Sequence, residues 1–189
     1  MNGFDRIDDA ALAGLARDGS SEAFGALVHR YHGRVFAFLL TLTRHRQDAE
    51  DLTQETFLRA WDKFGRYDPE RPLLPWLLTL ARRQSITALR RIRRVPEEII
   101  APAAPEPENL SLRLWGLAKS QLTPTAYSAL WLHYREELPL KEEAAILGKR
   151  EGAVKVILHR ARHALAASVH GQQRAEYPGC LPEPQRSML

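Results

Sequence analysis

Apolar residues recur every three or four positions along most of the chain, which is the spacing of amphipathic α-helices. The clearest run covers residues 48–64, where Phe57, Ala60, Trp61 and Phe64 form an apolar stripe. It holds no Gly or Pro, and its acidic residues are concentrated early, which suits the dipole of one continuous helix. The pattern predicts a helix whose aromatic side is anchored in a core.

A second side of this predicted helix is acidic. Asp48, Asp51 and Glu55 recur at helical spacing, with Gln54 beside them. Most charged helix faces are simply solvated, and periodicity alone does not distinguish that reading from a docking surface for a partner.

The chain before and after this helix is also predicted to be helical. A short helix capped by Asp8 or Asp9 ends at Asp18-Gly19, and a longer one starts at Ser20 or Ser21. Residues 65–72 contain Gly, Asp-Pro and a second Pro and are predicted to form a loop.

Residues 73–94 are predicted to form one long helix with a strongly basic side. Leu77, Leu80, Ala81, Ala88 and Ile92 would be its buried side. No acid interrupts the opposite stripe, so we expect an anionic partner such as duplex phosphate to lie against it. The stripe comprises Arg82, Arg83, Thr87, Arg90, Arg91, Arg93 and Arg94.

Residues 95–109 divide the chain, with four prolines, four glutamates and no basic residue. This composition predicts an extended acidic linker. We therefore predict an all-α protein of two small helical domains, 1–94 and 110–170, joined by the linker 95–109. The tail 171–189 lacks periodicity and is predicted to be disordered.

The second domain carries the spacing of a helix-turn-helix. A helix is expected over 110–121 and another after Thr123-Pro124, followed by helices over 140–147 and 151–167. Ala144, Gly148 and Val154 supply the small residue, the left-handed turn and the apolar plug of this motif. Its open side would suit the major groove; it carries Lys149, Arg150, Lys155, His159, Arg160 and Arg162.

Composition narrows the class of protein. The chain has 189 residues, a net charge of +4 and a single cysteine, Cys180. No disulfide can form within one chain, and no apolar stretch reads as a signal peptide or a membrane span, so we expect a cytoplasmic protein without membrane insertion. His29 with His32 and His159 with His163 lack further ligands, and we expect no metal, no cofactor and no enzymatic activity.

Two stretches resemble one known family. The string Asp48-Ala-Glu-Asp-Leu-x-Gln-Glu-x-Phe-x-x-Ala-Trp61 resembles bacterial RNA polymerase sigma factors of the sigma-70 family, extracytoplasmic-function (ECF) group. The segment 122–165 resembles the second conserved domain of that family. The resemblance implies that Asp48, Asp51, Gln54 and Glu55 bind core RNA polymerase.

The resemblance also implies two DNA contacts and a regulator. The helix-turn-helix would read the minus-thirty-five element of promoter DNA, and the first domain would hold the minus-ten region. An anti-sigma factor is an expected partner. In this family the acidic linker occupies the polymerase's RNA path, although an ordinary tether would have the same composition.

Strand opening requires unstacked bases to be captured on aromatic surfaces or in a pocket. The resemblance places Tyr67 and Asp68 at that position, beside Trp61, Phe64 and Trp76. The tryptophans fit a core role equally well.

The sequence departs from the family pattern at several positions. Arg83 and Thr87 stand where Asn and Asp are common, which changes the expected minus-ten preference because Asn reads adenine edges and Arg does not. Val156 and Ile157 replace a usual Ser-Arg pair and offer methyl groups for thymine contact. Glu143 stands where Ile is usual, and the sequence gives no physical reason.

Two other functions explain the sequence less well. A polymerase-independent helix-turn-helix regulator explains residues 122–165 but leaves the acidic face and the linker unexplained. An enzyme has no support, because the sequence shows no catalytic triad, phosphate-binding loop or metal cluster.

Overall fold

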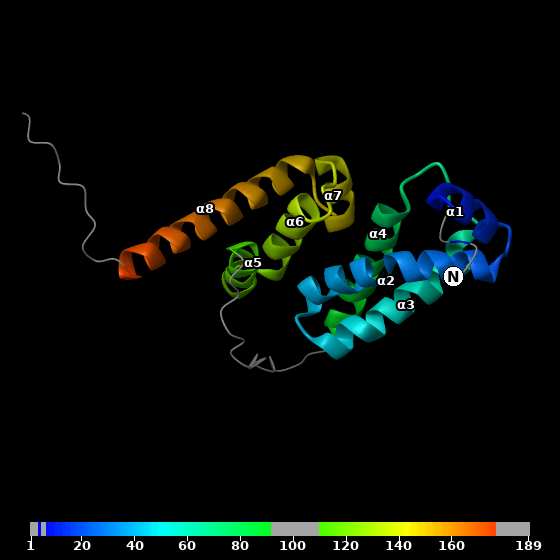
Figure 1. The fold of residues 1–189 in the computed structure, drawn as a ribbon, viewed down its shortest axis with the longest axis horizontal. Coiled ribbons are helices and arrows are strands. Elements are labelled where there is room, and N and C mark those ends of the chain that lie inside the picture. Colours follow the sequence, from blue (N-terminus) through cyan, green and yellow to red (C-terminus); the bar gives the residue numbers. More distant parts are fainter. Residues whose placement is uncertain (1–3, 5–6, 92–109, 177–189) are drawn as a thin grey trace, which may run out of the picture.

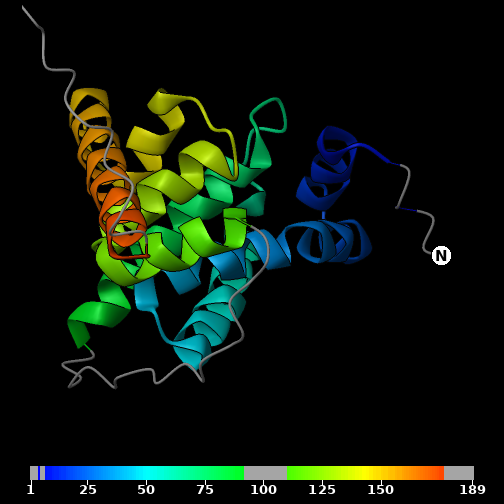
Figure 2. The same ribbon diagram turned by 60° about the vertical axis from the view of Figure 1, so that its left-hand side comes forward.

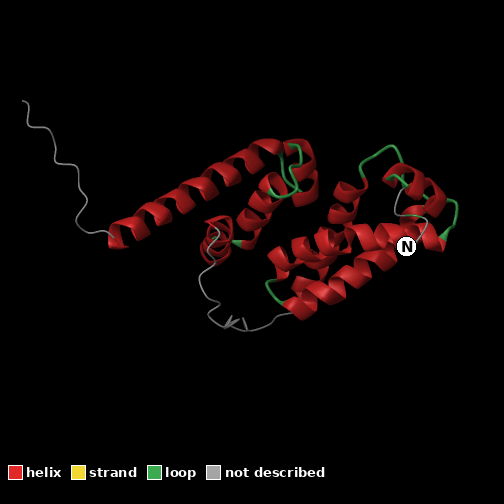
Figure 3. Cartoon of the chain, in the orientation of Figure 1, coloured by secondary structure: helices red, strands yellow, loops and turns green. Residues whose placement is uncertain are grey.

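The computed structural model describes residues 4, 7–91 and 110–176, and this part of the chain folds into eight helices without a strand (Figures 1 and 3). The all-α prediction is therefore confirmed. The predicted linker 95–109 and the end of the predicted tail lie outside the described residues.

The first four helices form the first domain. They are α1 (Asp9–Arg17), α2 (Ser21–Thr43), α3 (Arg46–Phe64) and α4 (Leu73–Arg91). Asp8 caps α1 by accepting a hydrogen bond from the Ala11 amide at 2.7 Å, and Ser20 caps α2 through the Ala23 amide at 3.1 Å. These starts were predicted, whereas α3 begins two residues before the predicted helix.

The second domain comprises α5 (Leu110–Gln121), α6 (Pro124–Tyr134), α7 (Leu140–Leu147) and α8 (Glu151–Glu176). Gly148 ends α7 with a φ of 58°, in the left-handed region that favours glycine. Ala144 and Val154 are buried beside this turn, as the helix-turn-helix spacing predicts. The prediction for the tail was wrong at its start, because α8 continues through Glu176.

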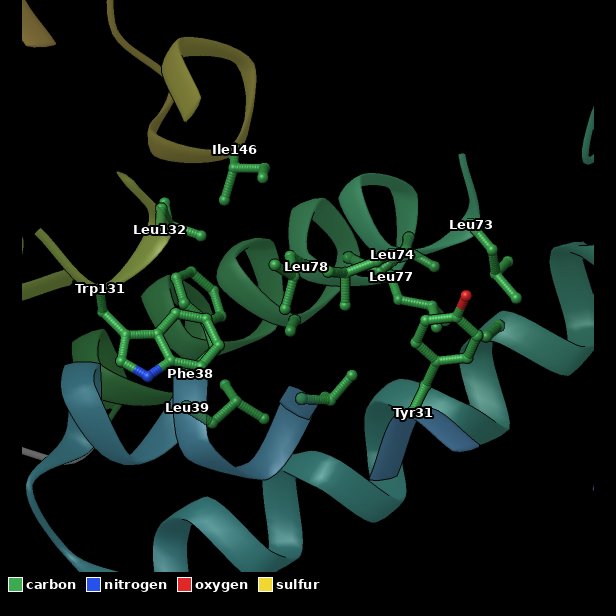
Figure 4. Close-up of a cluster of buried hydrophobic side chains, with 14 of the residues drawn as sticks. Tyr31, Phe38, Leu39, Leu73, Leu74, Leu77, Leu78, Trp131, Leu132 and Ile146 are labelled. Carbon is green, nitrogen blue, oxygen red and sulfur yellow. The ribbon is translucent and has the colours of Figure 1, made fainter. Parts of the chain in front are cut away.

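The two domains pack directly against each other, which the prediction of two tethered domains did not anticipate. The second domain lies on α2 and α4, with α6 against α2 and α7 against α4 (Figures 1 and 2). Figure 4 shows one apolar cluster in which Phe38 and Leu78 of the first domain face Trp131, Leu132 and Ile146 of the second.

Candidate protein and nucleic-acid interfaces

One side of α3 presents a row of polar side chains to solvent. Asp51 and Gln54 are exposed and Glu55 is partly exposed, while Phe57 and Phe64 are buried on the other side of the helix. Glu55 pairs with Arg59 at 2.6 Å, one turn along. The row is thus held rigidly by a helix whose opposite face is core.

Asp48 differs from the other three acidic-face residues. Its carboxylate lies 3.5 Å from the imidazole of His45, and only 15% of its side chain is exposed. His45 also caps α3 by accepting the Asp48 amide proton. Asp48 therefore helps to start the helix and offers little surface to a partner.

Leu58 also belongs to this surface, although it was not predicted from the sequence. It follows Gln54 and Glu55 by one turn, and 68% of it is exposed. A leucine this exposed between polar neighbours provides apolar area that a partner can bury. Its spacing from Asp51, seven residues, could have placed it on the row.

The structure buries some of the predicted base-capture residues and leaves others exposed. Phe64 and Tyr67 are 1% and 5% exposed and pack with Trp76 in one aromatic cluster, with ring centroids 4.9 to 5.7 Å apart. The Tyr67 hydroxyl donates to the Arg71 carbonyl, and burial raises the pKa of Tyr67 to about 12. Phe64 and Tyr67 are therefore core residues here and cannot serve as stacking surfaces.

The remaining two residues of that set reach the surface. Trp61 is 38% exposed and packs against Phe24, with ring centroids 5.0 Å apart. Asp68 is half exposed and lies 3.3 Å from Arg71. The loop borders a cavity of ≈ 460 Å³, lined among others by Tyr31, Tyr67, Arg71, Leu74 and Leu138.

The basic side of α4 is only partly open. Arg83 and Thr87 are exposed, whereas Arg82 is partly buried beside Gly148 of the second domain. Burial lowers the pKa of the Arg82 guanidinium from its ordinary value. The side chains of Arg90 and Arg91 and the whole of Arg93 and Arg94 lie outside the described part.

The start of α8 and the turn before it present a continuous basic surface. All the residues predicted to contact DNA there are exposed, and Val156 is 48% exposed. Tyr134 of α6, which the prediction did not include, is 50% exposed and lies 3.4 Å from Arg162. The exposed set comprises Lys149, Arg150, Lys155, Val156, His159, Arg160 and Arg162.

Comparisons with known proteins identify the family of this chain. Residues 27–95 match the family model Sigma-70 region 2, and residues 113–165 match Sigma-70, region 4. The chain is 38% identical over 152 residues to RNA polymerase sigma factor CarQ of Myxococcus xanthus, covering 76% of this chain and 87% of CarQ. It is 32% identical over 146 residues to ECF RNA polymerase sigma factor SigM of Bacillus subtilis, covering 72% and 89%.

The chain belongs to the ECF sigma factors. It is a non-enzymatic transcription initiation factor that directs RNA polymerase to promoters. Its fold is similar to that of the sigma factor RpoE in a co-crystal structure with the anti-sigma factor NepR from Bartonella quintana. The TM-score is 0.67 at 25% identity, over 78% of this chain and 96% of that one.

The structure also explains one departure of this sigma factor from its family. Glu143 is fully buried, and its Oε1 lies 2.7 Å from Nδ1 of His133 on α6. Its Oε2 has no hydrogen-bond partner within the described residues. Burial raises the pKa of Glu143, and His133 opposes that rise. Glu143 is thus tolerated in a core position because a histidine faces it.

The described residues contain no group of three or more potential metal ligands, and the His159 and His163 rings instead lie 4.3 Å apart. Across 7–91 and 110–176, no helix has both the length and the apolar character to cross a bilayer.

Proposed function

We propose that this sigma factor binds core RNA polymerase through the exposed row of α3, which comprises Asp51, Gln54, Glu55 and Leu58. The single observation that carries this proposal is the row itself: three polar side chains and a leucine stand exposed on a helix whose other face is core. Apolar area surrounded by polar groups is the usual composition of a specific protein interface.

In this proposal the basic surfaces contact promoter DNA. The turn and start of α8 would lie in the major groove of the minus-thirty-five element, where Lys155, Arg160 and Arg162 contact phosphates or base edges. Val156 offers its methyl groups to a thymine. Arg82, Arg83 and Thr87 of α4, with Arg90, Arg91 and Arg94, would hold the minus-ten region.

Base capture would use the surface beside the loop 65–72. Trp61 and Asp68 provide exposed aromatic and acidic groups on this surface, while Phe64 and Tyr67 are buried. Of these four residues, only Tyr67 lines the cavity beside the loop. An unstacked base entering such a site would exchange solvent for aromatic contact, which is sequence-tolerant unless edge contacts add selectivity.

We further propose that an anti-sigma factor regulates this protein and that both act in the cytoplasm with the polymerase. The support is the fold similarity to a sigma factor crystallised with its anti-sigma factor. A pull-down from cells that recovers polymerase and no second partner would contradict the proposal of an anti-sigma factor.

Run-off transcription with purified core polymerase on a pool of bacterial promoter fragments tests the function. Wild type should give defined transcripts that fade for Asp51→Ala/Gln54→Ala. Glu50→Ala is the matched control, because Glu50 is an acid of the same helix that pairs with Arg46 at 2.8 Å. An equal loss of transcripts with Glu50→Ala, or undiminished transcripts with Asp51→Ala/Gln54→Ala, would contradict the proposal. Symmetric operator protection without polymerase would favour the helix-turn-helix regulator instead.

A further inference from the structure

A buried acid joins two helices of the second domain. Glu143 of α7 is fully buried, and its Oε1 lies 2.7 Å from Nδ1 of His133 on α6. Its Oε2 has no hydrogen-bond partner within the described chain. Because α6, α7 and α8 each pack against the other two, this contact also affects how α8 is held (Figure 1).

The protonation state of the pair decides whether this contact is favourable. When the carboxyl of Glu143 holds the proton, Oε1 donates it to Nδ1 of His133, and the unpaired Oε2 is a neutral carbonyl oxygen. When that proton is lost, a carboxylate with one unpaired oxygen faces a neutral imidazole in the core. An unpaired charged oxygen costs far more to bury than an unpaired neutral one. The geometry therefore favours the pair that keeps its proton.

A short path of contacts connects this pair to the basic surface of α8. The ring of His133 meets the ring of Tyr134 edge-on, with centroids 4.8 Å apart. The Tyr134 hydroxyl lies 3.4 Å from Nη1 of Arg162, which is exposed on α8. A shift of α7 against α6 at Glu143 would therefore reach a side chain of the proposed DNA-binding surface.

The charged groups of the neighbouring helices leave His133 as the partner of this carboxyl. Burial raises the pKa of Glu143, and His133 opposes that rise. Arg82 of α4 lies at the turn between α7 and α8, and Arg162 of α8 contacts the Tyr134 hydroxyl. The other ionisable side chains of α7 are Lys141, which is exposed, and Glu142, which is partly exposed.

We propose that His133 and Glu143 are positioning residues for promoter recognition, and that the proton of this pair keeps α7 and Arg162 in the DNA-binding arrangement. Loss of the proton puts a net negative charge in the core, and α7 shifts until the carboxylate reaches water. Affinity for the minus-thirty-five element then falls as pH rises, by up to about tenfold per pH unit for one proton. This inference rests on the proposed function, which assigns that element to α8.

The pH profile of promoter binding tests the proposal. The full chain bound to core polymerase is titrated onto a promoter fragment recovered in the run-off assay, between about pH 6 and about pH 8.5 at fixed ionic strength. Glu143→Gln keeps the shape of the protonated carboxyl but cannot ionise. It should match wild type within about twofold at the acid end and bind roughly tenfold more tightly at the alkaline end.

Two further variants make this comparison specific. Glu143→Ile, which carries the residue usual in the family, should also keep its affinity at high pH, and it serves if Glu143→Gln folds poorly. Glu142→Gln is the matched control, because it removes a neighbouring acid of the same helix, and its profile should follow that of wild type. A ratio of affinities between wild type and both Glu143 variants that stays constant with pH would overturn the proposal.

Nuclear magnetic resonance of the free full chain separates this proposal from the proposed function. The carboxyl carbon signal of Glu143 and the Nε signal of Arg162 should move with one common midpoint in wild type. In Glu143→Gln the Arg162 signal should no longer follow that titration. If no variant binds promoter at any pH, the proposed function fails, and this titration still decides the coupling. An Arg162 signal that ignores the titration of Glu143 would overturn the positioning role.

Discussion

The exposed row of α3 and the basic side of α4 belong to the same domain but differ in access. Asp51, Gln54 and Leu58 face solvent, whereas Arg82 is partly buried against the second domain. A surface that is already open can bind its partner at once. A surface that is partly covered binds only after a rearrangement, and its apparent affinity falls by the fraction of open molecules.

This difference suggests an order of events. Under the proposed function, polymerase can dock on α3 while the two domains stay in contact. The partly covered Arg82 would contribute to DNA binding only after the domains separate, whereas the exposed basic residues of α8 are open to DNA throughout. The predictions below alter one side of the comparison at a time.

The largest effect is expected from Leu58→Ala. As the apolar hot spot of the proposed interface, Leu58 should cost about 2 kcal/mol of binding on truncation, so the affinity for core polymerase should fall about 30-fold. The fold should be unaffected because Leu58 is 68% exposed. Titration of labelled protein with core polymerase measures this. Leu15→Ala, a leucine 44% exposed on α1, is the control, and equal affinities for all three proteins would remove Leu58 from the site.

The second effect concerns the contact between the two domains, in which Arg34 of α2 pairs with Glu136. Arg34→Ala leaves the Glu136 carboxylate without its cross-domain partner and should shift the equilibrium toward separated domains by about 1–2 kcal/mol. Thr41 and Ser128 meet across the same contact, and the rate at which Thr41→Cys and Ser128→Cys form a disulfide should fall accordingly. The swap Arg34→Glu with Glu136→Arg should restore part of that rate, and no rescue would mean that the pair does not hold the domains.

The third effect separates two neighbouring arginines. Arg83→Ala removes an exposed cation. The slope of log K for DNA binding against log salt concentration should therefore become shallower by about one. Adding Arg83→Ala to the Thr41→Cys/Ser128→Cys protein should leave the rate of disulfide formation unchanged. Arg82→Ala should instead raise the fraction of open molecules, because Arg82 lies in the interface beside Gly148. Identical behaviour of the two variants would contradict the distinction between the open and the covered side of α4.

The smallest effect lies in the core of the second domain. The pKa of Glu143 is raised above its ordinary value of 4.5, so the native state holds this proton more tightly than the unfolded state does. Its favourable contribution is complete below 4.5 and is lost as pH rises through the raised pKa. Glu143→Gln should gain stability relative to wild type as pH increases, by about 1 kcal/mol or less per pH unit.

Urea unfolding of both proteins from pH 4.5 to 7.5 checks this. A difference in unfolding free energy that stays constant with pH would show that Glu143 does not titrate in this window.

The sequence predicted most helices because their start and end residues act locally. Asp8, Ser20, Thr123 and Gly148 all sit at the helix ends that their capping chemistry implies. It failed where burial depends on how separate helices pack together. Tyr67 resembles an exposed loop aromatic until Phe64 and Trp76 are seen to enclose it.

The contact between the two domains likewise could not be predicted from the sequence. Phe38 and Trp131 each fit the periodicity of their own helix, and nothing local indicates that they meet. Leu58 shows the reverse failure: its spacing from Asp51 indicates the exposed row, but a leucine is ordinarily assigned to the core. The presence of Glu143 at a core position is explained only by the contact with His133, which the sequence does not show.

The most direct test of the account is the distance between the domains in the free and the polymerase-bound protein. Fluorescence energy transfer between dyes at Asp18→Cys and Lys119→Cys, two exposed positions outside the proposed sites, reports it in the full chain with Cys180→Ser. We predict one population in the free protein, because the docked domains have a single arrangement, and a shift to lower transfer when core polymerase is added. Several populations in the free protein, or the same transfer in both states, would contradict the docked arrangement as the resting state.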